Sequence, residues 1–180
     1  MGKKSFIGIK QIWYTKPLVA EPTQDTLKTL IQSATEVENV HEGTWGYSQD
    51  DPTVTEYINE LTGKPYYRDK ESAGNKTITF TLGEYDYEDK AALQGGEVIK
   101  AAGSTVVGWK SSGSLENIYK AVIAKTKTGR YVIFSNAIIV GKTDTQQKAL
   151  GLGISAVALE SETEGIADEY WFDAPAESGS

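Results

Sequence analysis

Hydrophobic and polar residues alternate with a period of two along much of this chain. The segment 77–82 (TITFTL) places three apolar side chains on one face and three threonines on the other, which predicts a half-buried strand. In 130–140 (RYVIFSNAIIV) both alternating sets are mostly apolar, so we expect a strand covered on both faces. The segment 118–127 reaches this strand through Thr128-Gly129 and predicts a hairpin with it. The other predicted strands are Phe6–Trp13, Glu38–Tyr47, Val54–Leu61, Thr105–Trp109, Ile154–Glu160 and Tyr170–Phe172.

Two segments follow a helical period instead. Thr23 is the expected N-cap of the first helix, with Asp25 in its first turn and an apolar stripe after it. The second helix is 86–94 (DYEDKAALQ), capped by Asp86 and ended by Gly95-Gly96. We therefore predict a mainly β fold, sandwich-like or barrel-like, with one flanking α-helix and a second short helix. The stripe of the first helix consists of Leu27, Leu30, Ile31 and Ala34.

A long polar excursion separates two of the predicted strands. Between Asp50 and Gly74, polar and apolar residues alternate but large aliphatic residues are few, which predicts a protruding hairpin-like loop at about residues 50–74. Residues 173–180 (DAPAESGS) contain no aliphatic anchor, so we expect a flexible C-terminal tail. No repeat of fixed period and no linker divides the sequence, and we predict that residues 1–172 form a single domain.

The charge balance of the chain narrows the range of partners. Its 180 residues carry a formal net charge of −7, which argues against binding nucleic acid through phosphate neutralisation. No apolar run approaches the roughly 20 residues of a membrane-spanning helix, so we expect no membrane contact. The basic N-terminus is followed by only a short apolar segment, unlike a secretory signal. We expect a soluble protein that stays inside a cell, or inside a particle assembled there.

Few residues of the sequence suggest catalysis. There is no cysteine, and the single histidine, His41, has no second histidine with which to share a metal, so we expect a surface or turn residue. The acidic run 84–89 (EYDYED) lacks the spacing of a calcium loop and is better explained by helix capping. Gly151-Leu152-Gly153 has no helix after it to hold a phosphate, and indicates close backbone contact. We predict no enzymatic activity, no metal and no cofactor.

The order of the elements, rather than any short motif, resembles the tail tube family of long-tailed bacteriophages and its relatives in contractile injection systems. The resemblance covers nearly the whole chain. An N-terminal strand (FIGIKQIWY) and a helix (TQDTLKTLIQSA) precede a long loop (DDPTVTEYINELTGKPYYRDKE) and an alternating strand (TITFTL). A short helix ending in Gly95-Gly96, a hairpin pair (NIYKAVIAKTKTGRYVIFSNAIIVG), the polar segment Lys142–Lys148 and a final strand (GLGISAVALES) follow.

The resemblance implies a structural subunit that closes into a hexameric ring, and it implies that these rings stack into a tube. The tube surrounds a tape measure protein, meets tail tip or baseplate and terminator proteins, and later lets DNA pass without specific binding. Such a protein assembles in the cytoplasm of the bacterial host and ends in the virion. Because Tyr and Arg are favoured at interfaces, we assign the long loop to subunit contacts. The predicted interface residues are Asp50, Asp51, Tyr57, Tyr66, Tyr67 and Arg68.

Two other functions remain open from the residues alone. The first is a monomeric β-sandwich module that binds carbohydrate or a receptor through exposed aromatic side chains. The second is a hydrolase that uses carboxylates far apart in the sequence. We favour core or interface roles for the aromatic residues, because strand-borne aromatics usually pack. These residues are Trp13, Tyr14, Trp45, Tyr47, Trp109, Tyr170 and Trp171.

Overall fold

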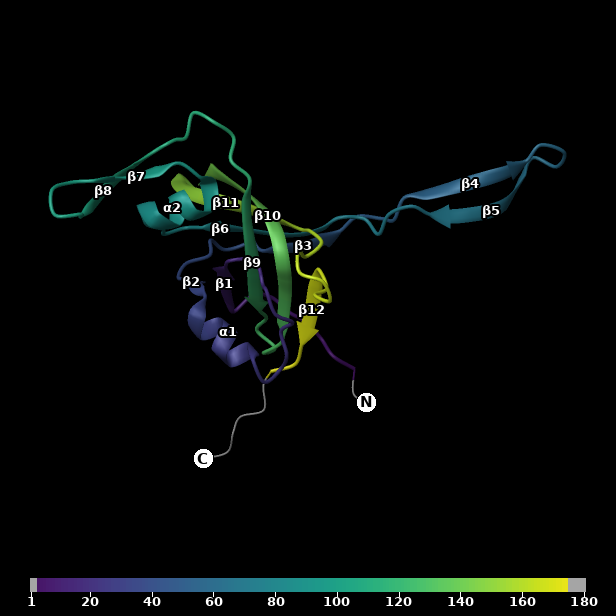
Figure 1. Cartoon of the computed structure of the whole chain (residues 1–180), viewed down its shortest axis with the longest axis horizontal. Coiled ribbons are helices and arrows are strands. Elements are labelled where there is room, and N and C mark those ends of the chain that lie inside the picture. The colour runs from purple at the N-terminus through teal and green to yellow at the C-terminus, as the bar shows by residue number, and fades with distance from the viewer. Residues whose placement is uncertain (1–2, 175–180) are drawn as a thin grey trace.

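The computed structural model describes residues 3–174 and confirms the mainly β fold with two helices (Figure 1). Within these residues the strands form one eight-stranded sheet and two separate two-stranded sheets. Of the predicted flexible tail, residues 173–180, the part 175–180 lies outside the described residues. The elements are β1 (Gln11–Thr15), α1 (Leu27–Ser33), β2 (Thr35–Val37), β3 (Gly46–Gln49), β4 (Val54–Asn59), β5 (Lys64–Lys70), β6 (Lys76–Leu82), α2 (Tyr87–Gln94), β7 (Glu97–Lys100), β8 (Val106–Lys110), β9 (Ile118–Lys125), β10 (Tyr131–Gln146), β11 (Ala149–Ala158) and β12 (Glu169–Phe172).

The longest strand, β10, joins the two halves of the large sheet. The order is β2-β1-β9-β10-β11-β6-β3, and β12 also pairs with β10. On one edge β10 pairs with β9, which confirms the predicted hairpin. On its other edge, residues 131–134 pair with β12 and residues 137–146 pair with β11. One strand thus sets the register of three neighbouring strands.

A bulge lies where β10 passes from one half of the sheet to the other. The register with β9 shifts between Phe134 and Ala137, which leaves Ser135 and Asn136 in the irregular segment, both of them buried. Their main-chain groups bond to loops instead of strands. The Ser135 N–H donates to Asp168 O (3.1 Å), and Asn136 O accepts from the N–H of Leu159 (2.9 Å). These bonds satisfy groups that would otherwise be buried without partners.

The inner core fills the space enclosed by the bent sheet. Along β6 the alternation places Ile78, Phe80 and Leu82 inside, each at most 2% exposed, as the sequence predicts. The predicted strand 130–140 is confirmed as covered on both faces, because every residue from 131 to 137 is buried. Other members of the inner core are Ile12, Tyr14, Val37, Leu93, Val122, Val132, Phe134, Ala137, Ile139, Leu152, Ile154 and Ala156.

Helix α1 covers the opposite face of the half that contains β1, β9 and the start of β10. Leu27 is fully buried there beside Trp13 and Ile123, and the expected stripe residues pack on the same cluster. The helix is shorter than predicted. It begins at Leu27, so Asp25 lies before the helix and not in its first turn. The Thr23 hydroxyl still accepts a hydrogen bond from the Thr26 N–H (3.2 Å), so the capping interaction forms one turn before the regular helix.

Two predicted strands differ from the structure because glycines interrupt them. In the segment Phe6–Trp13, Gly8 adopts a φ of 60°, and regular pairing begins only at Gln11. In the segment Glu38–Tyr47, Gly43 adopts a φ of 76° within a turn, so the prediction of one strand was wrong. Strands β2 and β3 flank that turn. The short strand β7 was not predicted, because its four residues EVIK carry too little alternation to be recognised.

The polar segment 142–148 belongs mostly to strands rather than to a connection. Strand β10 continues through Gln146 and pairs with β11, and Gln147 and Lys148 form the turn with φ values of 46° and 73°. Two consecutive residues with positive φ are the requirement of the tight hairpin turns that match strand twist. The polar residues here are partly or fully exposed, so their polarity reflects solvent contact and not a break in the sheet.

Helix α2 forms as predicted and packs against β10. The Asp86 carboxylate accepts from the Asp89 N–H (2.7 Å), and Gly95 ends the helix with a φ of 84°. Its C-terminal turn lies directly on Gly141 of β10. A Cβ built on that glycine would lie 2.3 Å from the carbonyl oxygen of Leu93, so no side chain fits there.

We expect Gly141→Ala to destabilise the fold by about 1–3 kcal/mol, because the backbone of α2 must move away from β10. Urea denaturation followed by tryptophan fluorescence measures the change in the free energy of unfolding. Gly113→Ala is the matched control, since a Cβ at Gly113 has no atom of the described residues within 4 Å. Equal stability of the two variants would contradict this account of the α2–β10 contact.

Candidate assembly surface

The hairpin β4–β5 extends the ladder of β3 and β6 beyond the body of the molecule (Figure 1). The last regular pair of the body is Gln49 with Lys76. The strands then continue through two isolated backbone bonds, from Asp50 N–H to Asn75 O and from Glu71 N–H to Thr53 O, each 2.8 Å long. These bonds fix where the hairpin leaves the body.

The neck of the hairpin is narrow. Gly74 has a φ of 74°, and a Cβ there would lie 2.1 Å from the carbonyl oxygen of Asp50. Only glycine allows these two segments of the neck to approach so closely. Asp50 and Asp51, two of the predicted interface residues, lie at this neck and are exposed. They are therefore separated along the strands from the other four predicted interface residues.

Those other four residues lie together on the hairpin. Tyr57 and Tyr67 are directly paired across the strands, with ring centroids 5.7 Å apart. Arg68 Nε lies 2.8 Å from a carboxylate oxygen of its cross-strand neighbour Glu56. Tyr66 occupies a bulge, because Tyr57 pairs with Tyr67 while Ile58 already pairs with Pro65, and its side chain is 70% exposed.

The structure adds three apolar residues that the sequence analysis did not select. Val54 and Ile58 are about half exposed, and Leu61 at the tip is 95% exposed. Together with Tyr57, Tyr66 and Tyr67 they make both faces of the hairpin largely apolar, because Val54 and Tyr57 point to opposite faces of β4. The two strands have no core of their own. An isolated two-stranded hairpin is marginally stable in water, and clustered exposed apolar side chains mark interaction sites. We call these six residues and Arg68 the hairpin surface.

A polar cluster anchors the root of the hairpin. Lys76, the first residue of β6, lies 2.8 Å from Asp168 and 3.2 Å from Glu169 of β12. Tyr47 of β3 donates its hydroxyl to Glu169 (2.7 Å). Burial lowers the pKa of Lys76, but its bonds to Asp168 and Glu169 outweigh burial, and the net shift is upward. For Tyr47, burial and the bond to Glu169 both raise the pKa. The cluster therefore joins β3, β6 and β12 below the neck.

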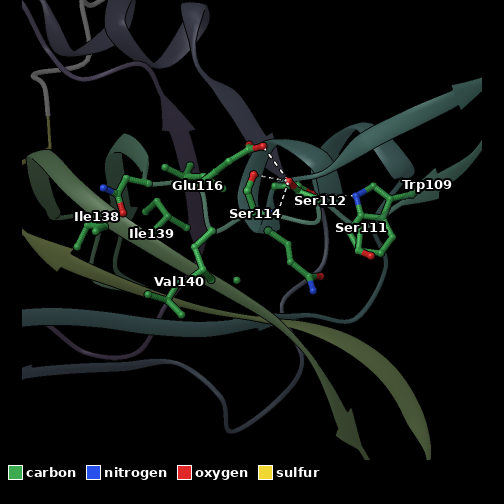
Figure 2. Close-up of a pocket in the computed structure, with 14 residues that line it drawn as sticks. Trp109, Ser111, Ser112, Ser114, Glu116, Ile138, Ile139 and Val140 are labelled. Atoms are coloured by element: carbon green, nitrogen blue, oxygen red, sulfur yellow. Dashed lines mark hydrogen bonds between the residues drawn. The ribbon is translucent and has the colours of Figure 1, made fainter.

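A groove lies on the side of α2 and the hairpin β7–β8 (Figure 2). It has a volume of about 400 Å³ between the end of α2, the loop 111–117 and β10. The Trp109 indole N–H donates to Gly95 O (2.9 Å) and fixes one wall. Figure 2 shows Ser112 bonded to Ser114 and Glu116 along the loop, at 3.1 Å each. Ile138, Ile139 and Val140 supply the apolar wall on β10.

The groove contains one buried polar atom without a partner. Among the described residues, Gln94 Oε1 accepts no hydrogen bond although it is inaccessible to solvent. Leu115 lies on the rim and is fully exposed. A buried acceptor left unpaired costs about 1–3 kcal/mol.

The aromatic residues considered for ligand stacking are mostly engaged within the chain. Trp13 and Tyr14 are buried in the two cores. Trp171 is 45% exposed, yet its ring packs edge-on against Phe6 and Tyr47. Lys90 covers the ring of Trp109, with Nζ 4.6 Å from the centroid.

The residues considered for catalysis make hydrogen bonds within the fold. His41 lies in the turn before β3, where its Nδ1 is 3.2 Å from the carbonyl oxygen of Glu42. Asp89 accepts the Tyr14 hydroxyl at 2.7 Å. Over residues 3–174 no group of three or more His, Cys, Asp or Glu is arranged to hold a metal ion. Neither α1 nor α2 nor any other helical stretch of that range is long and apolar enough to cross a membrane.

Comparison with known proteins does not add to this geometry. No protein-family model matches the sequence, and no curated protein matches it either.

The anchoring cluster predicts a specific dependence of stability on alkaline pH. The folded-state pKa of Tyr47 lies above that of an unfolded tyrosine, so its contribution is complete below about pH 10 and is lost as the pH rises further. We expect Tyr47→Phe to lower the free energy of unfolding by about 1 kcal/mol at pH 7. The difference from wild type should shrink above about pH 10.

Denaturation curves at a series of alkaline pH values measure this convergence. Tyr119→Phe is the control, because Tyr119 is 42% exposed and its hydroxyl has no hydrogen bond among the described residues. A constant gap between wild type and Tyr47→Phe at all pH values would show that the hydroxyl bond is not responsible.

Proposed function

We propose that this chain is a structural subunit that polymerises as stacked rings, of six copies by the family resemblance, into a phage tail tube. The observation that carries the proposal is the hairpin surface. It presents six apolar or aromatic side chains to water on a projection with no core. Burial against another subunit would remove these side chains from water. Tyrosine and arginine are residue types that such interfaces favour.

The ends of the large sheet provide a second contact. Strands β2 and β3 end the pairing order, and within residues 3–174 no strand pairs with their outer edges. Short edge strands resist random pairing, yet they still offer backbone donors and acceptors to a neighbouring copy. A contact between two different edges is heterologous, and it closes into a ring when the rotation between copies permits.

The net charge of −7 suits the passage of DNA through such a tube. An acidic lumen repels phosphates and prevents the chain from retaining the genome. In this proposal the partners are further copies of the chain, a tape measure protein inside the tube, and tail tip or baseplate and terminator proteins at its ends. The protein assembles in the host cytoplasm and remains in the virion. It has no catalytic role.

The proposal predicts that the purified protein forms rings or tubes visible by negative-stain electron microscopy. Shortening the hairpin should abolish stacking while the body remains folded, because the hairpin contributes no residue to either core. Thr53 and Glu71 are already bonded, so Gly-Gly can replace residues 54–70 as a tight turn. Loss of the folded state in this variant would show that the hairpin is part of the body.

A single substitution tests the apolar character of the surface. Leu61→Asp should raise the protein concentration needed for assembly by about thirtyfold, the effect expected of an interface hot spot. Val19→Asp is the matched control, because Val19 is 81% exposed but lies in the loop between β1 and α1. A wild-type protein that stays monomeric at high concentration, even with tail tip or tape measure partners added, would favour a monomeric binding module instead.

A further inference from the structure

We propose that the groove beside α2 receives the tip of the hairpin β4–β5 from a second copy of the chain. This inference rests on the proposed function and specifies its contact. The groove and the hairpin are two places where the described residues leave apolar surface open. The hairpin offers a projecting apolar side chain, and the groove offers a concave apolar surface.

The groove has the shape and chemistry of a receptor for one large side chain. Its volume of about 400 Å³ lies within the range of pockets that hold ligands. Isoleucines of β10 and the indole of Trp109 line it, and Leu115 extends the apolar surface at the rim. The wall is firm, because the Trp109 N–H is bonded to Gly95 O and because Gly141 keeps α2 in contact with β10.

The hairpin tip offers complementary groups. Leu61 is 95% exposed and is the most projecting apolar side chain of the turn. Tyr66 and Lys64 lie near it on β5, and both carry hydrogen-bond donors. Lys64 also complements the exposed Glu116, the one charged residue that lines the groove.

The arrangement of the two surfaces requires a second copy. In Figure 1 the hairpin projects from one end of the long axis, while α2 and the hairpin β7–β8 lie toward the other end. The tip of one chain therefore cannot enter its own groove. A contact between unlike surfaces at opposite ends leaves one free hairpin and one free groove after each addition, so it propagates without limit. This is the geometry that stacking needs.

The absence of cysteine makes the contact directly measurable. Full-length Leu61→Cys and Leu115→Cys proteins are mixed under assembly conditions and treated with a short bis-maleimide linker. We expect the yield of linked heterodimer to exceed that of the control mixture by about tenfold or more, because assembly raises the effective concentration of the two thiols. The control mixture pairs Leu61→Cys with Val19→Cys, whose position is 81% exposed and lies outside the groove.

A second pair of variants tests the groove without cross-linking. Leu115→Asp should raise the concentration needed for assembly by about thirtyfold, as Leu61→Asp does. Because Leu115 is fully exposed, circular dichroism and the urea midpoint should stay at wild-type values. Mixing the two Asp variants should restore only a single round of stacking, since one intact tip and one intact groove remain.

The outcomes separate this inference from the function on which it rests. Rings or tubes that require the hairpin, but give no linkage between positions 61 and 115 above the control, would overturn the groove as receptor and leave the structural function standing. A wild-type protein that forms no assembly and gives no linkage would overturn both. Equal linkage at positions 115 and 19 would identify random collision and reject the groove.

Discussion

The structure depends on the pairing of one long strand along both of its edges. Strand β10 holds β9 on one side and, on the other, β12 followed by β11, so the two halves of the sheet share it. The change of partner occurs at the bulge formed by Ser135 and Asn136, whose main-chain groups bond to the loops beside them. Because those groups are bonded, the sheet can bend there and enclose the inner core.

This bend also decides which surfaces remain open. Helix α1 covers the outer face of one half, and α2 packs at the end of β10 through Gly141. The ladder of β3 and β6 continues past the body and carries Tyr57, Tyr66 and Leu61 into solvent. The apolar residues of the hairpin are thus exposed because of the topology, not because the core lacks room. Under the proposed function, this exposed apolar surface is the contact with another subunit.

Elements with a regular hydrophobic period were predicted correctly from the sequence. Segments with an irregular backbone were not. The alternation of Ile78, Phe80 and Leu82 and the capping of α2 by Asp86 are local patterns, and both were confirmed. Gly43 divided a segment that reads as one strand, because the turn depends on its φ and not on hydrophobicity. The groove was not predicted at all. It combines Gln94, Trp109 and Ile139, which are distant in the sequence, and no spacing rule relates them.

By itself the sequence determined the mainly β class, both helices, the paired segments around Thr128-Gly129 and the polar character of residues 50–74, because these follow from short-range periodicity and turn chemistry. Only the tertiary structure decided that residues 54–70 form an exposed apolar hairpin, that Asp50 and Asp51 lie apart from its surface, and that a groove with an unpaired acceptor lies toward the opposite end. The reason is physical. Exposure is a property of the whole packed chain, and the same alternating tyrosines would be core residues if another layer covered them.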